Sequence, residues 1–279
     1  MDKSRSPAVR SGGLRIGIGA IAAIVWLLFG QLSAAEISVA AASDLNPAIR
    51  EIAARFEAQG GHHVRIASGS SGNFYAQIVN GAPFDLFLSA DINYARSLEQ
   101  NGLIVPGSLR LYGIGRLVVW VPKGSTLPLQ ARGIEVLADP SVRKIAIANP
   151  VHAPYGRAAE AALRHFGLYD KVQPRLILGE SVSQAAQFVQ SGGAEAGIIA
   201  LSVALSPQMR QSGDYREIPA SAYPALEQAM VVLKTAQIRK SLGAAQALAD
   251  WIAGPEGKEI LGLYGFTVPP ERPGAGKAK

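Results

Sequence analysis

Short apolar strands alternate with amphipathic helices along most of this chain. After the apolar run Glu36–Ala41, for example, Leu45, Ile49, Ile52 and Phe56 recur at the spacing of one helix face. The pattern predicts strands at 36–41, 64–67, 86–89, 117–121, 144–148, 176–178, 196–200 and 230–233. It predicts helices at about 45–60, 72–80, 91–101, 157–165, 182–190, 242–253 and 256–264. Strands separated by helices indicate the α/β class with mostly parallel sheets.

The first 35 residues have a different pattern, which is typical of an export signal. Basic residues within the first 15 positions precede an apolar run at 16–29, and small residues follow at 33–35. We therefore expect cleavage before Glu36 and a periplasmic location. An uncleaved anchor helix is the alternative, but the apolar run is shorter than the ~20 residues that span a bilayer. It is also interrupted by Gly17 and Gly19.

Composition and charge exclude several classes of protein. The chain has no cysteine, so apolar burial must stabilise it without disulfides, and a lipid-modified N-terminal cysteine is excluded. Part of the net charge of +6 lies in the presequence, and the remaining Lys and Arg are scattered. We expect no nucleic-acid partner. His62 and His63 would point to opposite faces of a strand, so we expect no metal site, and no glycine motif indicates a cofactor. The end of the chain, 269–279, is rich in Pro, Gly and Lys and predicts a frayed tail.

Hydroxyl residues stand where two expected strands meet the helices that follow them. Ser43 and Asp44 follow the first strand, and Ser70 and Ser71 follow the second. A helix N-terminus offers unpaired N–H donors and a partial positive charge, so it attracts anions. The alternative is that these residues are ordinary helix caps, which is a common role for Ser and Asp.

The second half of the chain supplies two more junctions of this kind. One runs from 150 to 156 and includes Tyr155, and the other runs from 179 to 182 and ends at Val182. Open α/β sheets bind ligands at the carboxyl ends of their strands. Four helix N-termini could therefore surround one cleft.

Several motifs resemble those of the periplasmic molybdate-binding proteins. They are AAASDL at 40–45, SGSSG at 68–72, QI at 77–78, GAPFDLFLSAD at 81–91, ANP at 148–150, APYG at 153–156, GP at 254–255 and YGFT at 264–267. The resemblance covers about 36–268, and its most specific part is the run at 81–91. It implies a type II periplasmic binding protein with a ligand cleft between two lobes. The expected divisions are a signal peptide at 1–35, lobe one at 36–121 and 223–268, and lobe two at 122–222.

The resemblance also implies a ligand set and partners. In that family, hydroxyls at the positions of Ser43 and Ser71 bind the anion, and so do backbone N–H groups at the positions of Tyr155 and Val182. Their neighbours Asp44 and Ser70 are expected to add N–H donors. Some members use a tyrosine in the strand 197–200, where this chain has Ala200, so that contact is expected to be missing. The implied ligand is molybdate or tungstate, and the implied partner of the monomeric receptor is the membrane permease of an ABC importer.

None of the four junctions contains Lys or Arg, although Arg157 follows one of them closely. A cage of neutral donors suits a fully deprotonated oxyanion, whereas a protonated phosphate would leave its O–H unpaired. Asp44 could accept such a proton, so we expect its carboxylate to cap a helix and point away from the anion. A sulfate or phosphate receptor is one alternative, and a secreted α/β enzyme acting on a phosphorylated substrate is another.

Overall fold

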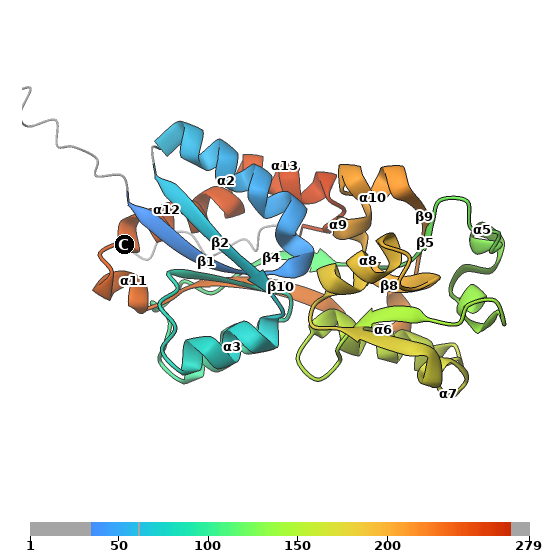
Figure 1. Cartoon of the computed structure of the whole chain (residues 1–279). Helices are drawn as coiled ribbons and strands as arrows, with labels where there is room; N and C mark the ends of the chain where they lie inside the picture. Colours follow the sequence, from blue (N-terminus) through green and yellow to red (C-terminus); the bar gives the residue numbers. More distant parts are fainter. Residues whose placement is uncertain (1–34, 61, 269–279) are drawn as a thin grey trace, which may run out of the picture. The chain divides into compact units, whose positions relative to one another are not determined.

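The strands form two five-stranded sheets in the computed structural model, which describes residues 35–60 and 62–268 (Figure 1). The first sheet has the order β2 (His63–Gly69), β1 (Glu36–Ala42), β3 (Leu86–Ser89), β10 (Leu226–Val232), β4 (Arg110–Gly115). The second has the order β7 (Leu176–Gly179), β6 (Ile145–Ala148), β8 (Ala196–Ala200), β5 (Leu117–Pro122), β9 (Gly213–Glu217). The expected signal peptide, apart from its last residue, and the tail at 269–279 lie outside the described residues.

Each sheet contains one strand that runs against the others. In the first sheet β2, β1 and β3 are parallel, and β10 is antiparallel to both β3 and β4. In the second sheet β7, β6 and β8 are parallel, and β5 is antiparallel to both β8 and β9. The α/β class with mostly parallel sheets is thus confirmed. The reversed strands, β5 and β10, are the ones that follow each passage of the chain between the sheets.

The chain passes between the two sheets at two places. Only Arg116 separates β4 in the first sheet from β5 in the second, and the chain returns between β9 and β10. The expectation that lobe one extends to Val121 is wrong for β5, since that strand pairs with β8 and β9. The apolar pattern does not reveal β4, because its two glycines weaken the β pattern, and without β4 the pattern places β5 in the wrong lobe.

Helices cover the sheets. The main helices of the first lobe are α2 (Asn46–Gly60), α3 (Ser71–Val79), α4 (Ile92–Gln100), α12 (Leu242–Ala253) and α13 (Pro255–Leu263). Those of the second lobe are α6 (Pro154–His165) and α8 (Val182–Gln190). Short helices are α5 (Leu129–Arg132), α7 (Tyr169–Val172), α9 (Leu201–Ala204), α10 (Pro207–Ser212) and α11 (Thr235–Ile238), with 3₁₀ turns η1 (Ser43–Leu45), η2 (Gly133–Ala138), η3 (Gln173–Arg175) and η4 (Ala220–Ala222). None of the helices among the described residues is long and apolar enough to cross a membrane.

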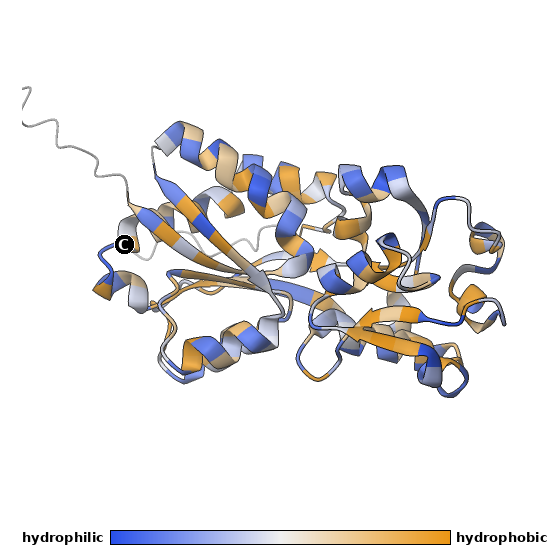
Figure 2. Ribbon diagram, in the orientation of Figure 1, coloured by the Kyte–Doolittle hydropathy of each residue, from blue (hydrophilic) through white to orange (hydrophobic). Residues whose placement is uncertain are grey.

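The apolar pattern places the core on both faces of each sheet. In β3, Leu86 and Leu88 pack with α2, α12 and α13 on one face, whereas Phe87 packs with α3 and α4 on the other. This follows from the alternation of side chains along a strand. In the second lobe, Trp120 of β5 is fully buried in a core shared with α6 and α8. Helices in Figure 2 carry both hydrophilic and hydrophobic colours, as expected for elements with one buried face.

Candidate anion-binding site

A small cavity lies where strands of both lobes end and helices begin. Its lining residues are Ala42, Ser43, Asp44, Gly69, Ser70, Ser71, Ala90, Ala153, Pro154, Tyr155 and Val182. Its free volume is about 10 Å³, which is close to the smallest space that holds one water molecule. The structure therefore brings together all six residues that the sequence predicts for the ligand. None of these described lining residues is Lys or Arg.

Three helices begin at this cavity, and each has a backbone N–H directed out of its first turn. In α3 and α8 the first residues are Ser71 and Val182, and in α6 the first N–H belongs to Tyr155 because Pro154 has none. These N–H groups have no partner inside their own helix. Within the described part of the chain, the structure gives none of the three another hydrogen-bond acceptor.

The next donors of the same helices are already paired. In α3, the Gly72 N–H donates to the His152 carbonyl at 3.0 Å, and in α8 the Ser183 N–H donates to Ser43 Oγ at 3.3 Å. In α6, the N–H groups of residues 156 and 157 both donate to the Ala153 carbonyl. One unpaired donor per helix therefore remains at the cavity, where the helix dipole also favours negative charge.

Two buried hydroxyls complete this set of donors. Ser43 and Ser71 are 4% and 1% exposed. The Ser43 Oγ accepts the Ser183 N–H, and the Ser71 Oγ accepts the Ala90 N–H at 2.9 Å. Each oxygen is thus held by one backbone donor, and its own proton can be donated elsewhere. Since both side chains line the cavity, both hydroxyls can donate to a bound anion.

Ordinary capping accounts for only one of the predicted serines. Ser70 is the N-cap of α3, and its Oγ accepts the Asn73 N–H at 3.3 Å. Ser71 is the first residue of α3 and not its N-cap. Ser43 is the first residue of η1, and no side chain of the described residues caps that turn. The hydroxyls of Ser43 and Ser71 are therefore not used as caps, which leaves them available for another role.

The Asp44 carboxylate lies in the cavity wall, so the expectation that it caps a helix is wrong. It accepts a hydrogen bond from Gln228 Nε2 at 2.6 Å. Burial raises the pKa of this carboxyl to about 6, although hydrogen bonds from Gln228 and Tyr155 oppose the increase. Gln228 in turn accepts a hydrogen bond from Tyr112 at 2.7 Å. Gln228 and Tyr112 could not be predicted from the sequence, because they lie on β10 and β4, far along the chain from Ser43.

The Tyr155 hydroxyl belongs to this wall as well. It accepts a hydrogen bond at 3.1 Å from Gln228 Nε2, the same nitrogen that donates to Asp44. Burial and the charge of Asp44 raise the tyrosine pKa well above its ordinary value, so the hydroxyl stays protonated. Ala200, where some family members have a tyrosine, ends β8 and has no hydroxyl. Gln228 therefore holds both the Tyr155 hydroxyl and the Asp44 carboxylate, and the Tyr155 N–H is the group that remains for a ligand.

Hydrogen bonds and an ion pair join the two lobes around the cavity. Ser202 of α9 donates to the Asp44 carbonyl at 2.7 Å, and Ser183 of α8 donates to the Ser43 carbonyl at 2.8 Å. The outer rim carries an ion pair between Arg157 of α6 and Asp91, whose atoms lie 2.7 Å apart. Arg157 thus pairs with a carboxylate and does not line the cavity. These contacts hold the lobes closed over the cavity.

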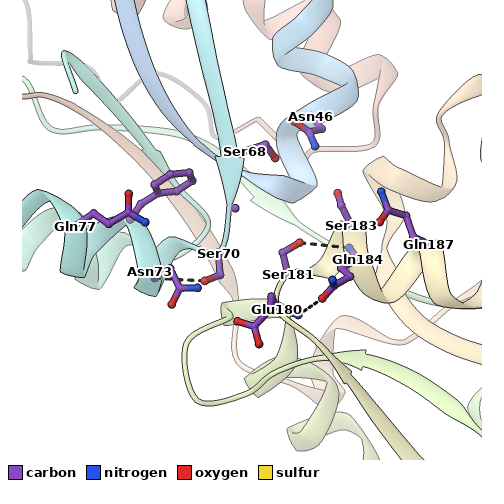
Figure 3. Close-up of a pocket in the computed structure, with 12 residues that line it drawn as sticks. Asn46, Ser68, Ser70, Asn73, Gln77, Glu180, Ser181, Ser183, Gln184 and Gln187 are labelled. Carbon is purple, nitrogen blue, oxygen red and sulfur yellow. Dashed lines mark hydrogen bonds between the residues drawn. The ribbon is translucent and has the colours of Figure 1, made fainter. Parts of the chain in front are cut away.

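A larger hollow adjoins the cavity and shares Gly69 and Ser70 with it (Figure 3). Its volume is about 440 Å³. Amide side chains from α2, α3 and α8 surround it: Asn46, Asn73, Gln77, Gln184 and Gln187. Glu180 is the one charged residue in the described lining. An anion that reached the cavity by this route would pass these amides and the Glu180 carboxylate, and no cationic side chain in the described lining.

Comparisons with known proteins agree with this geometry. Residues 37–267 match the family described as bacterial extracellular solute-binding protein. The molybdate-binding protein ModA of Azotobacter vinelandii is 38% identical over 242 residues, which are 87% of this chain and 94% of ModA. ModA of Rhodobacter capsulatus is 35% identical over 255 residues, which are 91% of this chain and 97% of that protein.

A solved structure shows the same fold. The periplasmic molybdate-binding protein of Azotobacter vinelandii superposes with a TM-score of 0.77 at 37% identity, over 84% of this chain and all of that one. This chain therefore belongs to the bacterial extracellular solute-binding protein family and, within it, to the relatives of ModA.

Proposed function

We propose that this protein is an extracytoplasmic receptor that captures molybdate, and also tungstate, for an ABC importer. Membership of a solute-binding family makes the chain a receptor and not an enzyme. The observation that carries the proposal is the donor set of the small cavity. Three helix N-termini with unpaired N–H groups and two buried hydroxyls meet there without a cationic side chain. The names of the two ModA relatives support molybdate as the anion.

The donors of this site can replace the water that surrounds a free oxyanion. A dianion that enters the cavity loses its water, which costs free energy unless donors replace it. Charge-assisted hydrogen bonds do so at about 1.5–3 kcal/mol each. In this proposal Ser43 and Ser71 donate through their hydroxyls, and Tyr155 and Val182 donate through their N–H groups. Asp44 and Ser70 would add backbone contacts beside them.

The proposal extends to location and partners. We infer that the basic and apolar presequence directs export to the periplasm, where the mature receptor acts as a monomer. When the lobes close on the anion, the loaded receptor presents a different surface from the empty one. A membrane permease distinguishes the two states only if it binds them with different affinity.

Selectivity tests the proposed function directly. Molybdate and tungstate should each bind the mature protein more tightly than sulfate or phosphate, by about tenfold or more. The two favoured anions should differ little from each other, because they have nearly the same size and charge. Isothermal titration calorimetry of the four anions in one buffer measures this. Sulfate binding that equals or exceeds molybdate binding would replace the molybdate assignment with a sulfate receptor.

Removal of either buried hydroxyl should weaken molybdate binding. Ser43→Ala and Ser71→Ala are each expected to lose about 1.5–3 kcal/mol of binding free energy, or roughly 10- to 150-fold in Kd, through one lost charge-assisted bond. Calorimetry measures the loss. The matched control is Ser206→Ala, which removes the N-cap of α10, where Ser206 Oγ accepts the Met209 N–H.

The control variant should lose about 1 kcal/mol of stability, as a lost cap does, and keep its affinity for molybdate. If Ser43→Ala and Ser71→Ala behaved like the control, the two hydroxyls would be structural and the proposed ligand set would be wrong.

A further inference from the structure

The buried carboxylate in the cavity wall is unusual for a site that attracts anions. Asp44 is 1% exposed and lines the cavity beside both serine hydroxyls. One of its oxygens accepts a hydrogen bond from the Gln228 amide, whereas Oδ1 is buried and has no hydrogen-bond partner among residues 35–60 and 62–268. A polar atom that is buried and unpaired is costly unless a ligand or a proton satisfies it.

The groups that face Asp44 leave its charge uncompensated. They are Gln228 on β10, whose amide donates to the carboxylate, and the hydroxyls of Tyr155 on α6 and Tyr112 on β4, which hydrogen-bond to Gln228. Ser202 on α9 donates to the backbone carbonyl of Asp44 and not to its carboxylate. Both tyrosines are neutral, since burial raises their pKa well above the ordinary value. Among the described residues, the ion pairs of the structure do not include Asp44. An ionised Asp44 would therefore repel a dianion a few ångströms away, with little water to screen the repulsion.

We propose that molybdate enters the cavity together with one proton, which Asp44 binds from solvent. This inference rests on the proposed function and adds a condition to it. In the protonated state Asp44 is neutral and its O–H becomes a further donor, so the wall no longer opposes the charge of the ligand. The near neighbours Gln228 and Tyr155 hold the carboxyl in place in either state.

Protonation of the Asp44 carboxyl costs little free energy near neutral pH. Burial already raises the pKa of the Asp44 carboxyl to about 6, and a bound dianion raises it further because like charges oppose ionisation. Between these two pKa values the complex holds one proton more than the free protein. Affinity must therefore increase as the pH falls through this interval and level off below about 6, where the free protein is also protonated.

Proton uptake measured by calorimetry tests the inference. Titration of the mature protein with sodium molybdate at pH 7.5, in two buffers of different ionisation enthalpy, gives the number of protons taken up per anion. We expect a value that approaches one. Over pH 8 to 6, the Kd should fall by up to about tenfold per pH unit, which is the slope for one linked proton.

Asp44→Asn supplies the decisive variant, because asparagine has nearly the same shape and does not titrate. Its proton uptake should be close to zero, and its affinity should be flat between pH 6 and 8. Ser43→Ala is the matched control, which should bind more weakly but keep the uptake. His152, whose Nε2 lies 3.1 Å from the Glu180 carboxylate, is unchanged in both variants. Uptake that persisted in Asp44→Asn would come from such a group and would overturn the proposal.

The two proposals can fail separately. If the wild-type protein bound molybdate tightly without proton uptake, the role of Asp44 would be wrong and the receptor function would stand. If it bound no molybdate at any pH from 6 to 8, the proposed function itself would be wrong. Should Asp44→Asn not fold, the wild-type uptake and its pH dependence still decide the question.

Discussion

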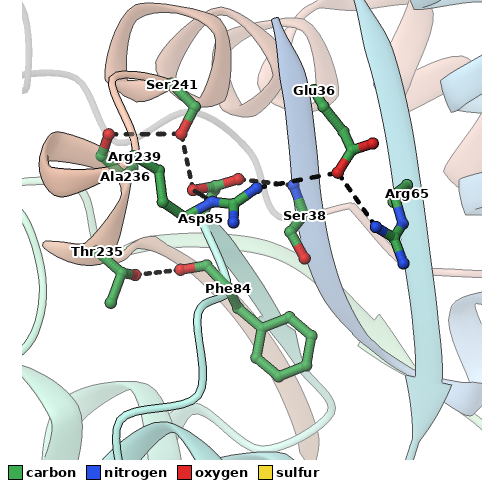
Figure 4. Close-up of polar contacts among 9 residues, drawn as sticks. All are labelled: Glu36, Ser38, Arg65, Phe84, Asp85, Thr235, Ala236, Arg239 and Ser241. Atoms are coloured by element: carbon green, nitrogen blue, oxygen red, sulfur yellow. Dashed lines mark hydrogen bonds and ion pairs between the residues drawn. The ribbon is translucent and has the colours of Figure 1, made fainter.

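Replacement of Asp85 by alanine should lower the free energy of unfolding by about 3–5 kcal/mol. This carboxylate is fully buried just before β3, the central strand of the first sheet, where it joins three segments of the chain (Figure 4). It accepts hydrogen bonds from the Ser38 N–H at 2.7 Å, from Arg239 Nε at 3.0 Å and from Ser241 Oγ at 2.7 Å. The variant would leave all three donors without this acceptor, and one of them is charged. Urea denaturation monitored by circular dichroism measures the loss.

An exposed ion pair gives the matched control for this variant. Asp250 pairs with Arg110 on the protein surface, and its side chain is 62% exposed. Asp250→Ala should cost about 0–1 kcal/mol, because solvent screens the pair and can hydrate the arginine that remains. If both variants lost the same free energy of unfolding, the buried contacts of Asp85 would stabilise the protein no more than an exposed ion pair does.

Gly115→Ala is expected to weaken molybdate binding by about 100-fold or more. Gly115 ends β4 in the first lobe, and a Cβ atom there would overlap the Tyr155 hydroxyl of the second lobe and lie 2.7 Å from Gln228 Nε2. Contacts below 3.0 Å force one partner to move. Because Tyr155 lies in the first turn of α6 beside the cavity, a methyl group at Gly115 would hold the lobes apart. Donors from both lobes then could not meet on one anion.

Calorimetry and small-angle X-ray scattering together test this prediction. In the wild-type protein, molybdate should lower the radius of gyration as the lobes close about the two connections, at Arg116 and between β9 and β10. In Gly115→Ala, molybdate should cause less compaction. The matched control is Gly243→Ala in α12, where a Cβ would meet no atom within 4 Å. It should keep full affinity and gain about 0.5–1 kcal/mol of stability from helix propensity.

Two observations would contradict the closure mechanism. One is an unchanged affinity and compaction in Gly115→Ala, which would show that the lobes close despite the added methyl group. The other is a wild-type radius of gyration that does not change at saturating molybdate although the free protein is open. That result would indicate a preformed site.

Local pattern in the sequence determined most of the secondary structure. The apolar spacing of Leu45, Ile49, Ile52 and Phe56 predicted α2 and its buried face, and three of these side chains are fully buried. The predicted helix at 242–253 has the bounds of α12. The helix predicted at about 91–101 is α4, and Asp91 caps it, because its carboxylate accepts the Asn93 N–H at 2.9 Å. These features depend on residues within a few positions of one another, so one sequence contains the whole signal.

The residues around the cavity were also found from sequence, but their arrangement was not. Each junction carries its own local signal, a polar or glycine-rich turn between a strand and a helix. The motif resemblance then joined Ser43, Ser71, Tyr155 and Val182 into one set. That all of them line a single cavity of about 10 Å³ is a result of the tertiary structure.

Only the tertiary structure decided which strands pair and what surrounds Asp44. The sequence placed β5 in the first lobe, whereas its hydrogen bonds put it in the second, beside β8 and β9. It predicted that the Asp44 carboxylate caps a helix, whereas this carboxylate accepts a hydrogen bond from Gln228, which lies 184 positions further along the chain. The physical reason is common to both. Periodicity and capping are local, so they leave a pattern in neighbouring residues. Strand pairing and buried polar networks join residues that are far apart in sequence, and no local pattern at either residue identifies its partner.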